Sequence, residues 1–304
     1  MKTLLNCLLI LFTFSSSAFA NIPITKGNGF STSSACISYF RDGVKIHTLY
    51  DKSTEIGEVV WMSRKTGRVK AKYFAYKEGS ESVIDRYNTW KSYITPILVT
   101  SGAYGDKMNS TGTPVGLTID NGRVVNYKLS SDKDALVIVY ATGGIAITNI
   151  EDADLTIRDN GNHTIDLNSK VSKKRFINWA KRKNATVFQT HLLIQDDRLK
   201  VYSNADKSIA FRKVLVLSRK KKTGELFHIL YNIQSKKYSL YEVSKKILRH
   251  QTLENMEVIM AVNTDTGGAN YIESEGQVVN CDGAHLTGHS PASSITNALV
   301  YYYK

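Results

Sequence analysis

Short strand-like stretches recur along most of this chain, and they constrain its fold more than any other feature of the sequence. Within them hydrophobic and polar residues alternate, which places the hydrophobic side chains on one face of an extended backbone. Asp120-Asn121-Gly122 separates two of the stretches and is typical of a tight β-hairpin turn. The predicted strands are Ile37–Phe40, Lys45–Tyr50, Glu58–Met62, Val69–Tyr76, Ile97–Thr100, Val115–Ile119, Arg123–Leu129, Ala135–Ala141, Val187–Ile194, Val214–Leu217 and Glu257–Val262. We therefore expect β-sheets to form a large part of the fold.

Three further segments show helical patterns. Helices are predicted near 82–93 and over 172–183, and Ser239-Leu-Tyr-Glu242 is a capping box that opens a third. No clear linker or repeat interrupts the chain. The sequence therefore predicts an α+β fold of mixed β-sheets with packed helices, in which residues 21–95 form a β-rich N-terminal part and residues 96–304 form the main core.

The first twenty residues are expected to be a signal peptide outside the fold. Lys2 supplies a positive charge, Leu4–Phe14 is hydrophobic, and Ala18-Phe19-Ala20 fits a small-x-small cleavage site. A buried N-terminal helix is the alternative. The signal predicts that the mature chain begins at Asn21 and is secreted or periplasmic.

Composition fits a globular protein and narrows its partners. The 304 residues are 42% hydrophobic, which is enough for a sizeable core. No later hydrophobic run reaches the roughly 20 residues of a membrane span. The 40 Lys and Arg exceed the 27 Asp and Glu by 13, and removing residues 1–20 takes away one Lys, leaving 39 − 27 = +12. A positive surface attracts phosphates, acidic glycans, nucleic acid or anionic membranes, and export argues against nucleic acid.

The cysteines allow two readings. Once residues 1–20 are removed, Cys36 and Cys281 are the only cysteines, and an oxidising compartment would allow them to form a disulfide. Two separate thiols are the alternative. Cys281 also begins a run with Asp282, His285 and His289, and these residue types bind metals. A polar loop is the favoured interpretation of this run, so no cofactor is assigned and a divalent cation stays an open alternative.

One loop draws attention as a candidate site. The predicted strand Glu257–Val262 runs directly into Asn263-Thr264-Asp265-Thr266-Gly267-Gly268-Ala269. A carboxylate in a glycine-rich turn at a strand end is a common position for chemistry in α/β folds. Gly267 and Gly268 would let the backbone approach a ligand closely, and nearby amides would keep Asp265 ionised. Taken alone, the spacing favours a plain turn with a solvated aspartate.

Three separated stretches resemble the phosphodiester glycosidase family. Gly112–Val125 resembles the family's Pro-Val-Gly-Leu segment followed by an Asn-Gly or Asp-Gly turn. Phe188–Ile194 resembles its Gln-Ser/Thr-Gly-Pro-Leu-Leu segment, and Asn263–Ala269 resembles its Asn-Leu-Asp-Gly-Gly-Gly-Ser loop. The order and approximate spacing agree from about Ile97 to the C-terminus, which is roughly two thirds of the chain.

The resemblance implies a hydrolase that cleaves a sugar from a sugar-1-phosphate diester in a glycan or cell-surface polymer. It implies a catalytic role for Asp265 as nucleophile, as base for water, or as stabiliser of the cationic sugar ring. The implied substrate contacts are Asn263, Gly267, Gly268, Gln189, Thr190 and Arg212. The alternatives are a strand-end amide bond for Gln189 and a surface salt bridge for Arg212.

The chain also departs from the family pattern. Thr100-Ser-Gly-Ala-Tyr-Gly105 stands where Asn-Gly/Ala-Gly-Met-Phe/Tyr is usual, and His191 and Leu192 replace Gly-Pro. In the loop, Thr264, Thr266 and Ala269 replace Leu, Gly and Ser. These changes support an alternative, a non-catalytic binder of glycans or anionic cell-surface polymers that uses the same cleft. A structural envelope protein is a third hypothesis, based only on the charge and the signal.

Three other features have a functional and a structural interpretation. His191 could act as a general acid, although a lone histidine in a strand is more often structural. The helix predicted over 172–183 carries Lys173, Lys174, Arg175, Lys181, Arg182 and Lys183. Such a helix is typically an exposed face, although it could hold an acidic glycan. The run Arg219–Lys222 is interpreted as a solvated charged turn, with an anion-binding patch as the alternative.

Overall fold

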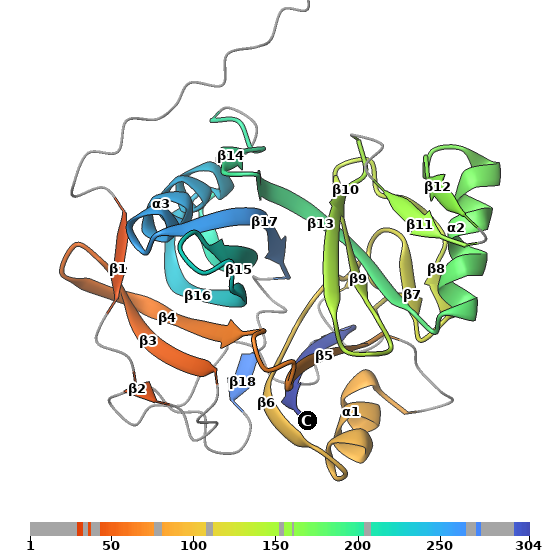
Figure 1. Cartoon of the computed structure of the whole chain (residues 1–304), viewed down its shortest axis with the longest axis horizontal. Helices are drawn as coiled ribbons and strands as arrows, with labels where there is room; N and C mark the ends of the chain where they lie inside the picture. The colour runs from red at the N-terminus through yellow and green to blue at the C-terminus, as the bar shows by residue number, and fades with distance from the viewer. Residues whose placement is uncertain are drawn as a thin grey trace, which may run out of the picture.

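The fold is mostly β. The computed structural model describes residues 29–32, 36–37, 43–75, 81–107, 112–151, 155–159, 161–203, 208–265, 272–274 and 295–304. Half of these residues lie in strands and 16% in helices. The expected α+β class is therefore wrong. Strands pair into large antiparallel sheets, and the three described helices pack singly against them instead of forming a layer (Figure 1).

One large sheet organises the molecule. Its thirteen strands are β1 (Phe30–Thr32), β2 (Cys36–Ile37), β3 (Val44–Asp51), β4 (Thr54–Ser63), β7 (Thr118–Asp120), β8 (Arg123–Asn126), β9 (Ala135–Val139), β10 (Ile145–Asn149), β13 (Thr186–Gln195), β14 (Arg198–Leu199), β15 (Ala210–Lys220), β16 (Leu226–Tyr238) and β17 (Met256–Thr264). The main strand order is β1-β3-β4-β16-β15-β17-β13-β7-β8. β13 connects the two halves of the sheet, because its first half pairs with β7 and β9 and its second half pairs with β17 and β14.

A second sheet packs against the first. It consists of β18 (Ile272–Ser274), β6 (Thr95–Thr100), β19 (Ala298–Tyr303) and β5 (Val69–Phe74), in that order. The largest hydrophobic cluster combines residues of both sheets, and within it Tyr73 stacks on Phe188 with 4.6 Å between ring centroids. β11 (Thr156–Arg158) and β12 (Asn162–Thr164) form a separate hairpin. The core between the sheets therefore joins chain segments that are far apart in sequence.

The local signals for turns and helices are confirmed. Asn121 and Gly122 both have positive φ, as the tight turn between β7 and β8 requires. The helices are α1 (Val83–Lys91), α2 (Lys170–Arg182) and α3 (Leu240–Leu253). Ser239 and Glu242 form both bonds of the predicted capping box at the start of α3. None of the described helices is long and hydrophobic enough to cross a membrane.

Candidate active site

Asp265 directly follows β17, and the C-terminal end of that strand lies near the middle of the molecule (Figure 1). It is only 4% exposed. Its backbone N–H donates to the carbonyl oxygen of Gly102 at 2.8 Å, and its own carbonyl oxygen accepts from Ser101 Oγ at 3.1 Å. The segment that follows β6 therefore fixes the backbone of Asp265. Because β17 and both of its neighbours are antiparallel, this is not the strand end of a parallel α/β sheet.

A buried lysine that the sequence analysis did not single out lies at the same place. Lys213 on β15 is completely buried, and its Nζ donates to Ser101 Oγ at 2.7 Å. Burial lowers the pKa of Lys213 to about 7, and the negative charge of Asp265 partly opposes that shift. Ser101 therefore connects the lysine to the backbone of Asp265. The sequence did carry a signal, since Lys213 occupies an inward position two residues before the hydrophobic Leu215.

Lys213 belongs to a polar row that crosses five neighbouring strands of the large sheet. The register pairs these residues in turn, and all are less than 9% exposed: Thr48, Glu58, Asn232, Lys213 and Thr264. A second row lies two residues away on each of the same five strands and faces the same side. This second row is hydrophobic and consists of Ile46, Val60, Leu230, Leu215 and Val262. Burying polar groups costs free energy unless they are hydrogen-bonded, so packing alone does not explain the polar row.

Glu58 supplies a second buried carboxylate in this row. Its oxygens accept from Asn232 Nδ2 at 2.9 Å and from Gln234 Nε2 at 3.0 and 3.2 Å. Burial raises the pKa of Glu58, and no described cation forms an ion pair with it. Asn232 Oδ1 is buried and has no hydrogen-bond partner in the described part of the chain. Glu58 is two strands from Lys213, so carboxylates lie on both sides of the buried lysine.

Asn263 lies next to this row and contacts a second group of polar side chains. Its Nδ2 donates to the hydroxyl of Tyr104, and its carbonyl oxygen accepts from Thr190 Oγ1. The ring of His191 packs edge-on against Tyr104, with 5.4 Å between centroids. Asn263 Oδ1 is buried without a partner among the described residues. Asn263, Thr190 and His191 are thus brought together. Tyr104, which contacts Asn263 and His191, is a residue of this group that the sequence analysis did not single out.

Gln189 has a different position from the one expected of a ligand contact. Its Oε1 accepts from the backbone N–H groups of Leu117 and Ser130 at 3.0 and 2.9 Å. Its Nε2 donates to the carbonyl oxygens of Ser130 and Lys133 at 2.8 and 2.6 Å. These four bonds use the full capacity of the amide. A Cβ on Gly116 would lie 2.6 Å from Gln189 Oε1, so a glycine is required there. Gln189 therefore holds together two of the stretches that carry the resemblance.

Arg212 also has structural partners. It is 5% exposed, its Nε donates to the carbonyl oxygen of Tyr238 at 3.2 Å, and its Nη2 donates to that of Ser208 at 2.6 Å. Adjacent residues of a strand point to opposite faces, so Arg212 points away from the face of Lys213. Its described hydrogen bonds are therefore with Tyr238 and Ser208.

Several expected site residues lie outside the described residues. These are Gly267 and Gly268 of the glycine-rich loop, Cys281 of the expected disulfide, and the metal-type residues Asp282, His285 and His289. For Cys36, only the backbone in β2 is described. Among the residues that the structure does describe, no group of three or more His, Cys, Asp or Glu side chains is arranged to hold a metal ion.

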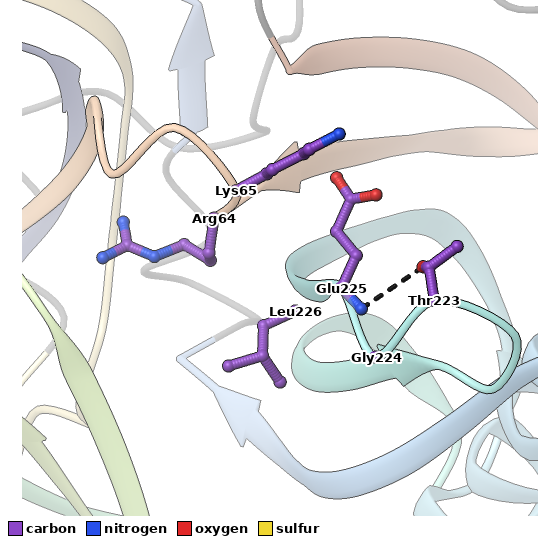
Figure 2. A pocket seen from close by; sticks show the side chains of 6 residues that line it. All are labelled: Arg64, Lys65, Thr223, Gly224, Glu225 and Leu226. Atoms are coloured by element: carbon purple, nitrogen blue, oxygen red, sulfur yellow. Dashed lines mark hydrogen bonds between the residues drawn. The ribbon is translucent and has the colours of Figure 1, made fainter.

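A pocket of about 410 Å³ lies elsewhere, between the β4–β5 connection and the β15–β16 turn. It is lined by Arg64, Lys65, Thr223, Gly224, Glu225 and Leu226. Figure 2 shows Arg64 pointing to one side, while Lys65 and Glu225 point to the other. None of the residues singled out around Asp265 lines this pocket.

Comparisons with known proteins reveal only distant likeness. No family model matches the chain, and no curated protein matches it. The zebrafish N-acetylglucosamine-1-phosphodiester alpha-N-acetylglucosaminidase catalytic domain, auto-inhibited by its pro-peptide, aligns over 94% of this chain and 85% of its own, with 15% identity and a TM-score of 0.45. A hypothetical protein from Synechocystis aligns over 90% of this chain and 62% of its own, with 9% identity and a TM-score of 0.42. Likeness at this level assigns no residue a role.

Proposed function

We propose that the chain is a hydrolase that cleaves a sugar from a sugar-1-phosphate diester in a glycan or cell-surface polymer. The observation that carries the proposal is the buried Lys213 beside Asp265, in a polar row that also holds the carboxylate of Glu58. Perturbed ionisable groups that are gathered at one place are typical of active sites. Export, as expected from residues 1–20, forms part of the proposal, because such polymers lie outside the cytoplasm.

The proposed chemistry follows from the charges that the reaction creates. Breaking the bond between the anomeric carbon and the phosphate oxygen leaves a cationic sugar ring and a phosphate monoester anion. Water then adds to the anomeric carbon and loses a proton, which gives the free sugar. The carboxylate of Asp265 would stabilise or trap the cationic carbon. The ammonium of Lys213 would stabilise the negative charge that grows on the phosphate. Because phosphate is a good leaving group, a strong general acid is less necessary than in ordinary glycoside hydrolysis.

Sugar hydroxyl groups would be bound by acceptors that have spare capacity. Asn232 Oδ1 and Asn263 Oδ1 are both buried and unpartnered among the described residues. A buried acceptor without a donor is destabilising, so a ligand hydroxyl that donates to it adds favourable binding energy. Glu58, which already accepts three amide contacts, would extend this acceptor surface. Gln189 and Arg212 are left out of the proposed contacts, because backbone groups already bind them.

A non-catalytic binder that uses the same groups is the second candidate. The observation that favours it is Ser101, which is buried where the family pattern has Asn and is bonded to Lys213 and Asp265. In this alternative, the lysine and the carboxylates recognise a sugar phosphate but do not turn it over.

Turnover by the full chain, exported from its expression host, distinguishes the two candidates. The substrates are a panel of sugar-1-phosphodiesters with and without a chelator, and released sugar is measured. Asp265→Asn should reduce turnover on the order of 10³-fold, because a group that acts in the transition state is lost. Asp120→Asn is the control, since Asp120 is an equally buried carboxylate bonded to Ala75 and Arg86. No turnover from folded protein, together with tight sugar-phosphate binding, would favour the binder.

A further inference from the structure

The exposed face of α2 has an unusual charge pattern. The helix reads KVSKKRFINWAKR and contains no acidic residue. Its hydrophobic side, Phe176, Ile177, Trp179 and Ala180, is buried in a core cluster. Lys170, Lys174 and Lys181 are exposed, and their spacing of four and seven residues places them along one side of the helix. With a rise of about 1.5 Å per residue, these ammonium groups form a line of roughly 15–20 Å.

Helix stability does not account for these cations. The N-terminal end of a helix carries a partial positive charge, so acidic residues stabilise the first turn and basic residues destabilise it. α2 nevertheless begins with Lys170 and has Lys173 and Lys174 three and four residues later, with no acid in the first turn. α3, in contrast, has the acidic Glu242 in its first turn. The basic start of α2 therefore costs stability that another property must offset.

The charges of α2 are also poorly neutralised. Arg182 pairs with Asp159, but Lys170, Lys174 and Lys181 form no ion pair with any residue that the structure describes. The other basic run of the chain differs, because Arg219 lies 3.6 Å from Glu257 and Lys221 lies 3.8 Å from Asp197. The shorter basic run is therefore partly compensated by acids, whereas three lysines of α2 are not.

An exposed aromatic ring adjoins the basic helix. Tyr127, just after β8, is 48% exposed, and the Lys173 ammonium lies 4.3 Å from its ring centroid. The β7–β8 turn packs on the C-terminal end of α2, where Gly122 N–H donates to the carbonyl oxygen of Ala185 at 3.0 Å. α2 and β8 lie side by side at the rim of the molecule, away from α3 and β17 (Figure 1). The ring and the cations therefore form one continuous surface.

We propose that this surface binds a linear anionic glycan. The α2 face is defined as Lys170, Lys174, Arg175, Lys181, Arg182, Lys183 and Tyr127. The line of cations matches the repeated charges of an extended polymer, and an aromatic ring beside a cation suits a sugar ring that bears an acid group. A membrane surface would call for a larger hydrophobic side, whereas Val171 is the exposed aliphatic residue of this helix. The site needs no catalysis and is independent of the proposed hydrolase activity.

Binding of a defined oligomer to the full chain tests the proposal. The probe is a fluorescent decamer of galacturonic acid, and anisotropy is measured between 50 and 300 mM salt. The triple variant Lys170→Gln, Lys174→Gln, Lys181→Gln should weaken binding at least tenfold and reduce the salt dependence. Tyr127→Ala should weaken it about threefold to tenfold. The matched control, Lys220→Gln, Lys221→Gln, Lys222→Gln, removes the same charge from the other basic run and should change binding less than twofold.

The competing outcomes are separable. Equal losses in the two triple variants would mean that net charge, not the α2 face, governs binding and would overturn the proposal. Tighter binding of a single-stranded DNA decamer, or of vesicles containing anionic lipid, would assign the face to nucleic acid or to a membrane instead. Equal binding of a neutral maltodextrin would also overturn it. Circular dichroism shows whether each variant is folded, and exposed Lys→Gln changes are expected to leave the fold intact.

Discussion

Two neighbouring rows of side chains on the large sheet are buried to a similar degree but differ in chemistry. One is the hydrophobic row of Ile46, Val60, Leu230, Leu215 and Val262, and the other is the polar row of Thr48, Glu58, Asn232, Lys213 and Thr264. Both rows run across the same five strands and face the same side. The strands and their register are therefore compatible with either kind of residue.

The difference separates the residues that stabilise this sheet from those proposed to serve its function. The hydrophobic row belongs to the cluster that joins the two sheets and gains free energy by removing side chains from water. The polar row holds a lysine and a glutamate that must be desolvated. Natural proteins depart from such local rules mainly at functional sites. The comparison predicts that the two rows respond differently to substitution.

The largest expected effect is a loss of stability in the hydrophobic row. Leu215→Ala removes a completely buried side chain from the core between the sheets. It should lower the free energy of unfolding by about 3–5 kcal/mol, through lost transfer energy and the cavity left behind. Urea unfolding measures this. Turnover per folded molecule should be nearly unchanged, and a large fall in turnover without a fall in stability would break the comparison.

The polar row should show the opposite behaviour. Lys213→Met keeps most of the side-chain volume but removes the ammonium that donates to Ser101. If the proposed reaction is correct, turnover should fall about 10²–10³-fold, because the charge on the departing phosphate is no longer stabilised. Lys220→Met is the matched control on the same strand, since Lys220 is exposed at the other end of β15. Unchanged kinetics in Lys213→Met would remove the lysine from the mechanism.

Some of this could be predicted from sequence, because the signals are local. The hairpin at Asn121-Gly122 follows from positive φ values that these residues accept readily, and the start of α3 follows from the reciprocal bonds of Ser239 and Glu242. The strand before Asp265 follows from its hydrophobic residues. Each of these features depends on residues only a few positions apart.

The rest could not be predicted, because it depends on pairing between distant strands. Glu58 and Asn232 are 174 residues apart in the chain and become neighbours only through the pairing of β4 and β16. The alternation along β15 places Lys213 on the same face as Leu215, but its polar neighbours Asn232 and Thr264 are known only once β15 is placed between β16 and β17. The predicted fold class was wrong for the same reason, since pairing within the sheet determines the strand lengths and the antiparallel partners. Gln189 appeared to be a ligand contact because a motif does not show which hydrogen bonds are already occupied.

A smaller effect should appear in the pH dependence of stability. Burial raises the pKa of Glu58 above its ordinary value of 4.5, so the folded state holds this proton more tightly than the unfolded chain does. Stability should therefore decrease as the pH rises above about 4.5. Glu58→Gln cannot ionise and should lack this decrease, which makes the variant relatively more stable at pH 7 than at pH 4. Urea unfolding at both values measures the difference, with the exposed Glu81→Gln as control; a difference that does not change with pH would contradict the burial argument.

The smallest expected effect is a change in stability at the ends of a helix, where a similar comparison applies. Lys170 opens α2 where a negative charge is preferred, whereas α3 has Glu242 in its first turn. Lys170→Glu should stabilise the protein by about 0.3–1 kcal/mol through the helix dipole, which corresponds to a rise in Tm of roughly 1–3 °C. Lys183→Glu makes the same charge change at the C-terminal cap and should lower Tm instead. Differential scanning fluorimetry at low salt compares the two variants. Tm shifts of the same sign in the two variants would attribute the effect to net charge. Opposite signs would show that the basic residues at the start of α2 reduce stability, as the buried polar residues of the large sheet do.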